Sequence, residues 1–140
     1  MNEQEFKHRT KQLGIQVIRF LEELPRNYVT DVLAKQLLRA ATSVGANYRA
    51  ACRGKSNADV IAKLSIVEEE VDETLYWLEV CREGSLVASV RFSKLMTEAD
   101  EILAMTVASI KTLRNRSLVA RSNFSTVQSK IQNPKSKISS

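Results

Sequence analysis

The sequence contains few residues that make turns or covalent cross-links. Its 140 residues include four glycines, two prolines and two cysteines. So little glycine and proline excludes collagen-like and proline-rich chains. It also argues against sandwiches and barrels, which need a turn roughly every 8–12 residues. Two cysteines, Cys52 and Cys81, are too few for a disulfide scaffold, so we expect free thiols in a reducing compartment.

Residues that usually carry chemistry are also scarce. His8 is the only histidine, and neither cysteine has a partner at metal-ligand spacing. There is no glycine-rich phosphate loop and no apolar run near the roughly 20 residues needed to cross a membrane. The polar start at residues 1–5 does not resemble a signal peptide. We therefore expect a cytoplasmic protein that is not an enzyme and has no metal, cofactor or membrane partner.

The C-terminal segment lacks acidic residues. Residues 113–140 contain six basic side chains and no acid, whereas residues 1–112 hold 15 basic and all 16 acidic side chains. The pI of about 9.4 therefore comes from the tail. A basic tail can attract RNA, DNA or an acidic surface, or it can serve only as a solubilising end.

Apolar residues recur at helical spacing through most of the chain. The steps between Phe6, Leu13, Val17, Phe20 and Leu24 place them on one face of a helix. Similar stripes predict helices over about 4–24, 29–53, 57–82 and 90–114. Pro25 ends the first helix, Asn27 or Thr30 caps the second, Ser56 caps the third, and residues 85–89 form a loop or frayed start. Gly45 lies inside the second helix, where a bare backbone lets a neighbouring helix come close.

Four long helices with short connections predict an up-down-up-down antiparallel four-helix bundle. We assign residues 1–114 to this all-α bundle. The apolar pattern fails after Leu113, so residues 115–140 are predicted to be a basic tail, disordered on its own from about residue 118.

Some apolar residues lie off the main stripes. A second apolar stripe usually means a second buried surface, which favours a homo-oligomer; the alternative is a wide core stripe. The candidate oligomer interface consists of Ile15, Ile18, Ile66, Trp77 and Val80.

Charged residues form two opposed patterns. Glu68, Glu69, Glu70, Asp72 and Glu73 make an acidic run in the third helix, and Lys35, Arg39, Thr42, Ala46, Arg49 and Arg53 make one stripe on the second. The stripe either pairs with acidic residues of the same or a neighbouring subunit, or offers a track of cations to phosphates, with Tyr48 nearby for stacking. Asn47 flanks the buried face, and we expect Glu70 or Glu73 as its partner. Candidate nucleic-acid-binding residues are Lys35, Arg39, Arg49, Arg53, Lys55, Lys63, Arg114, Arg116 and Arg121.

Several segments resemble a known family. They are QLLRAATSVGANYRAA at 36–51, KLSIVEEE at 63–70, ETLYWLE at 73–79, Phe6, Arg9-Thr10 and Leu24-Pro25. Over about residues 5–114 the chain is similar to the 23S rRNA intervening-sequence proteins. The resemblance implies a four-helix bundle that assembles as a homopentamer and brings no established catalytic residues. A more distant similarity is to the accessory protein of diversity-generating retroelements, a basic pentamer that works with nucleic acid.

Two functions remain open from the sequence. The basic stripe and tail favour a non-enzymatic oligomeric bundle that binds nucleic acid, such as structured RNA, or a nucleoprotein. The near-neutral bundle and the extra apolar residues favour a protein-interaction scaffold without nucleic-acid binding.

Overall fold

The computed structural model describes residues 1–84 and 90–132, with side chains as far as residue 128. The described residues form α1 (Glu3–Glu22), α2 (Tyr28–Ala51), α3 (Asn57–Glu83) and α4 (Val90–Gln132). The loop predicted at 85–89 and the last residues of the tail, 133–140, lie outside this description. No helix in the described part of the chain is long and apolar enough to cross a membrane.

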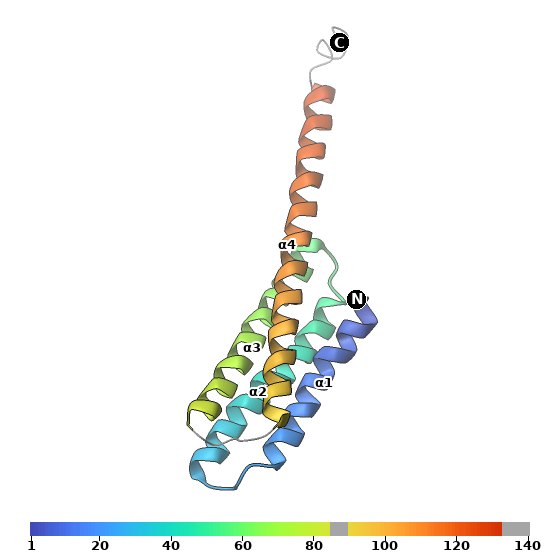
Figure 1. Ribbon diagram of the computed structural model, residues 1–140. Coiled ribbons are helices and arrows are strands. Elements are labelled where there is room, and N and C mark those ends of the chain that lie inside the picture. The colour runs from blue at the N-terminus through green and yellow to red at the C-terminus, as the bar shows by residue number, and fades with distance from the viewer. Residues whose placement is uncertain (85–89, 133–140) are drawn as a thin grey trace.

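The helices alternate in direction and pack side by side (Figure 1). α2 contacts both α1 and α3, and α4 contacts α3 and closes the bundle against α1. The predicted antiparallel four-helix bundle is therefore confirmed.

The predicted helix starts are confirmed by cap hydrogen bonds. The Asn27 side-chain oxygen accepts from the backbone N–H of Thr30 at 2.9 Å, so Asn27 rather than Thr30 caps α2. The Ser56 hydroxyl accepts from the N–H of Asp59 at 3.1 Å and caps α3. Such caps satisfy backbone donors that have no partner within the helix.

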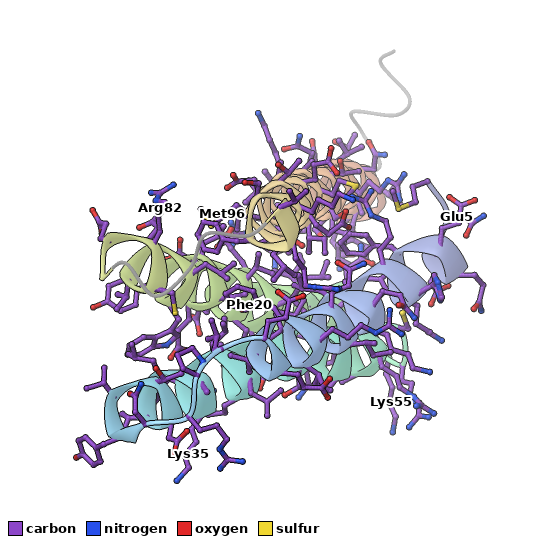
Figure 2. All side chains as sticks on the ribbon, turned by 60° about the horizontal axis from the view of Figure 1, so that its bottom comes forward. Glu5, Phe20, Lys35, Lys55, Arg82 and Met96 are labelled. Atoms are coloured by element: carbon purple, nitrogen blue, oxygen red, sulfur yellow. The ribbon has the colours of Figure 1, made fainter. Side chains whose placement is uncertain are left out.

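One apolar face of each helix forms the core. Phe20, Leu37, Leu78 and Leu95 are at most 1% exposed, and Figure 2 shows Phe20 lying between the helices. The Phe20 ring lies 6.0 Å from that of Phe92, which joins α1 to α4. A smaller group, Ala51, Leu64 and Ile110, closes the core near the α2–α3 turn.

Gly45 lies at a close approach between α1 and α2. A Cβ atom at Gly45 would stand 3.1 Å from both the Lys11 Cα and the Thr10 carbonyl oxygen. Both are backbone atoms of α1, so the neighbour cannot move aside as a flexible side chain would. The close approach predicted from this glycine is confirmed.

The predicted end of the fourth helix is wrong. α4 does not stop at 114 but continues to Gln132, so residues 115–132, predicted as part of a disordered tail, are helical. Figure 1 shows this segment projecting beyond the rest of the bundle. The physical reason is that no glycine or proline interrupts residues 90–132. The low burial inferred from the sequence is confirmed, because residues 118–128 are all exposed.

Candidate nucleic-acid interface

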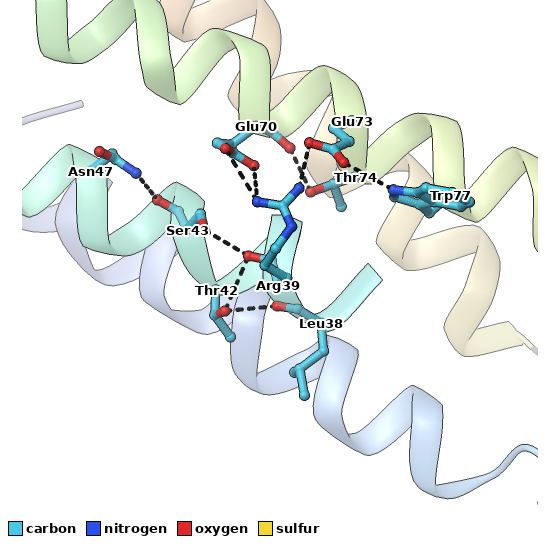
Figure 3. Close-up of polar contacts among 9 residues, drawn as sticks. All are labelled: Leu38, Arg39, Thr42, Ser43, Asn47, Glu70, Glu73, Thr74 and Trp77. Carbon is cyan, nitrogen blue, oxygen red and sulfur yellow. Dashed lines mark hydrogen bonds and ion pairs between the residues drawn. The ribbon is translucent and has the colours of Figure 1, made fainter. Parts of the chain in front are cut away.

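Arg39, in the middle of the predicted basic stripe, is held by two carboxylates of α3. Its guanidinium lies 3.4 Å from a carboxylate oxygen of Glu70 and 2.5 Å from one of Glu73 (Figure 3). The hydrogen bond from Arg39 lowers the pKa of Glu73, and the indole N–H of Trp77, 3.2 Å from the same carboxylate, adds to this shift. Arg39 therefore acts first as a cross-link between α2 and α3.

The small polar residues of α2 bond to their own helix. The Asn47 side-chain amide donates to the carbonyl of Ser43 at 2.9 Å, and the Ser43 hydroxyl donates to the carbonyl of Arg39 at 2.7 Å. The expected contact of Asn47 with Glu70 or Glu73 is therefore wrong. Those carboxylates already bind the guanidinium of Arg39, which satisfies them with a charge-assisted bond.

Tyr48 is not available for base stacking. Its ring packs edge-on against Phe6, with 4.6 Å between ring centroids, and it is half-buried against the core. Burial also raises the pKa of its hydroxyl. The stacking role expected from its place beside the stripe is not supported, because the ring already belongs to the α1–α2 packing.

The remaining basic residues of the stripe point to two different ends of the bundle. Lys35 lies beside the α1–α2 turn, where it lines a groove with Leu21 and Leu38. Arg49 and Arg53 are exposed near the end of α2 that leads into α3. Figure 2 shows Lys35 and Lys55 pointing outward from the bundle. The stripe is thus not one continuous cationic track.

The α2–α3 turn brings the second group of basic residues to the base of the projecting segment. The Asn57 amide of α3 lies 3.4 Å from the Ser117 hydroxyl of α4. Arg116 of α4 lines a groove with Cys52, one residue before Arg53. We call this cluster the basic end; its members are Arg49, Arg53, Lys55, Lys63, Arg114, Arg116 and Arg121.

The basic end is rich in cations that lack an ionic partner. All seven side chains are exposed. Within the described residues none of them forms a salt bridge, whereas Arg9, Arg39 and Arg91 each bind glutamates. Three acids, Glu3, Glu5 and Asp59, lie at the same end of the described helices. The local charge is therefore strongly positive. In the sequence, these cations are divided between residues 49–63 and residues 114–121.

The described part of the structure contains no candidate cluster for metal binding. No group of three or more His, Cys, Asp or Glu side chains there is placed to hold a metal ion. Both cysteines are free thiols, and burial raises the pKa of Cys52 and of Cys81. A thiol with a raised pKa carries little of the reactive thiolate form at neutral pH.

The candidate oligomer residues lie on α1 and α3, which are not adjacent helices in the bundle. Ile18 of α1 is 41% exposed, while Ile15, Ile66 and Val80 are half-buried. Trp77 of α3 packs partly against the core and edge-on against Tyr76. Tyr76, at 55% exposed, is an outward apolar residue that the stripe pattern missed. The oligomer remains a prediction.

The comparisons with known proteins agree with this fold. The family model described as 23S rRNA-intervening sequence protein matches residues 2–108. A crystal structure from Bacteroides thetaiotaomicron VPI-5482, described as a protein with unknown function from the S23 ribosomal protein family, superimposes with a TM-score of 0.71. It is 29% identical, and the match covers 79% of this chain and 99% of that one. A comparison with curated proteins gave no match.

The family match sets the bundle apart from the rest of α4. It ends at residue 108, so the projecting segment lies beyond it. Neither the family model nor this crystal structure is described as a retroelement accessory protein. Because the match covers most of the chain and all of α1, α2 and α3, this protein belongs to the 23S rRNA-intervening sequence protein family.

Proposed function

We propose that the protein is a non-enzymatic, oligomeric helical bundle that binds structured RNA through the basic end. The observation that carries this proposal is the convergence of unpaired cations from α2, α3 and α4 beside the α2–α3 turn. Cations spread over three helices can contact phosphates on a folded nucleic acid whose strands run in several directions. Phosphate contacts position such a ligand but do not read its sequence.

The ionic character of the site determines how binding should respond to salt. Each phosphate that a protein neutralises releases counterions, so affinity falls steeply as salt rises. The cations at the basic end need not break an internal ion pair before they bind. Arg39 would have to leave Glu70 and Glu73, and we therefore exclude it from the proposed contact surface.

The experiment is a salt titration of binding by fluorescence anisotropy, with a structured RNA and a DNA duplex. The test variant replaces Arg53, Lys55 and Arg116 with glutamine. The control variant has the same net charge and replaces exposed bases at the opposite end of the bundle, Lys35, Arg82 and Lys94. We expect the test variant to bind RNA at least about tenfold more weakly and with a smaller salt slope, and the control to bind like the native protein.

Oligomer formation is tested separately by sedimentation velocity. Ile18→Asp puts a charge on an exposed apolar residue of the candidate interface, and Val107→Asp does the same on the outer side of α4. We expect the Ile18 variant to dissociate and the Val107 variant to keep the native assembly. If the native chain sediments as a monomer, the oligomeric part of the proposal fails.

A protein-interaction scaffold is the second candidate function. It is favoured by the large apolar side chains exposed on the projecting part of α4, such as Phe124 at 66% and Val127 at 55%. The two functions separate in the same titration, because a scaffold without nucleic-acid binding shows no RNA or DNA affinity even at low salt.

A further inference from the structure

The buried face of α4 continues in register past the end of the bundle. Inside the bundle, Phe92, Leu95, Ala99, Ile102, Thr106 and Ile110 are buried and follow one another at steps of three and four. The same steps lead on through Leu113, Ser117, Ala120, Phe124 and Val127. We call this second set the outer seam. A repeat of seven residues with two apolar positions is the pattern by which helices pair along their length.

The outer seam is not covered by the helices that bury the residues from Phe92 to Ile110. Leu113 and Ser117 are half-buried at the rim, and Ala120, Phe124 and Val127 are exposed. Figure 1 shows no other described helix beside this part of α4. A single helix exposed to water is only marginally stable. Another helix laid along the seam would repeat the packing that the bundle gives to Phe92 and Leu95.

Basic side chains flank the outer seam on both sides. Arg114 and Arg121 border one side and Arg116 the other, in the positions that face a partner's flanking charges in a paired helix. No acidic residue occurs between 113 and 140. A second copy in parallel register would bring Arg116 against Arg121 of that copy, and like charges at such positions oppose pairing.

We infer that the outer seam docks one α-helix of a different protein, whose own apolar heptad stripe is flanked by Asp or Glu. Apolar contact with Phe124 and Val127 would provide the buried area, and the acidic flanks would pair with Arg116 and Arg121. The inference goes beyond RNA binding, since it depends on apolar side chains that offer nothing to phosphates. The seam also lies outside the residues matched by the family model.

The probe is a labelled synthetic peptide of about three heptads, with Leu and Ile in the seam positions and Glu at the flanks. Glutamates at all flanks keep the peptide from pairing with itself. A second peptide is identical except for Lys at the flanks. Binding of each to the full-length protein is followed by fluorescence anisotropy. We expect the acidic peptide to bind and the basic peptide to bind at least about tenfold more weakly.

A matched pair of protein variants locates the contact. Phe124→Ser with Val127→Ser removes the seam, and Leu118→Ser with Val119→Ser removes two residues of similar exposure on the other faces of the same helix. We expect the seam variant to bind the acidic peptide at least about tenfold more weakly and the control variant to bind it normally. Circular dichroism of each variant checks that the helix content is kept.

Three outcomes would overturn the inference. Unchanged binding of the acidic peptide by the seam variant would mean that the peptide binds by charge alone. Loss of the native oligomer in the seam variant would make a second copy the occupant. Loss of RNA affinity in that variant, with no acidic-peptide binding by the native chain, would assign the segment to RNA. The double variant Arg53→Gln with Lys55→Gln leaves Arg116 in place and is expected to weaken only RNA binding, so failure of the RNA proposal stays distinguishable from failure of this inference.

Discussion

The inner and outer parts of α4 have the same pattern of apolar residues in very different surroundings. Phe92 in the inner part is 7% exposed and contacts Phe20, whereas Phe124 in the outer part is 66% exposed. Both lie on the same line of the same helix. The comparison shows that a heptad pattern predicts which face of a helix can pack against another helix. It does not predict whether that other helix belongs to the same chain.

The largest expected effect comes from truncating Phe92, and truncation of Phe124 provides the comparison. Phe92→Ala should lower the free energy of unfolding by about 3–5 kcal/mol, because it leaves a cavity among core residues. Phe124→Ala should change it by less than about 0.5 kcal/mol, since the ring buries little in the isolated chain. Urea denaturation of both variants measures the difference. Similar losses in the two variants would mean that the outer part is already packed in solution.

A larger side chain at a close helix contact should have the next largest effect. Gly45→Val forces its side chain against the backbone of α1 and should cost about 1–3 kcal/mol. Ala120→Val on the outer seam meets no neighbouring helix and should change stability by less than about 0.5 kcal/mol. Thermal unfolding of the two variants tests this, and an equal loss would show that β-branching alone explains the effect.

Hydrogen exchange compares the stability of the inner and outer parts of α4 without any mutation. Amides of residues 95–110 should open only with the whole bundle, whereas amides of residues 118–128 should exchange through fraying at much lower cost. The acidic peptide should slow exchange in the outer segment alone. Strong protection of that segment in the free protein would contradict this picture.

The smallest expected effect concerns the ion pair between α2 and α3. Arg39 lowers the pKa of Glu73 in the folded protein, so the pair stabilises the fold above the ordinary pKa of a glutamate. That stability is lost as the pH falls through the lowered folded pKa. The melting temperature of Glu73→Gln should therefore lie below that of the native protein at neutral pH and approach it in acid. Glu79→Gln, an exposed control, should show no such convergence.

Much of the bundle was predictable because its signals are local. Asn27 and Ser56 are residue types that predict N-caps, and both cap their helices in the structure. The spacing of Phe6, Leu13 and Phe20 predicts the buried face of α1. The candidate site was less predictable. Arg39 and Arg49 belong to one stripe, but whether each meets a carboxylate depends on how α3 is aligned beside α2. The end of α4 was not predictable from the apolar pattern, because a segment that buries little can still be helical.

The sequence by itself determined the four helices, their apolar faces and the excess of positive charge after Leu113, since these follow from residue spacing and composition. Only the tertiary structure decided that Arg39 is occupied by Glu70 and Glu73. It also brings Arg53, Lys55 and Arg116 together at the basic end and leaves the outer seam exposed to solvent. The physical reason is that spacing sets the direction of a side chain from its own helix. What that side chain meets is set by the lengths and alignment of neighbouring helices.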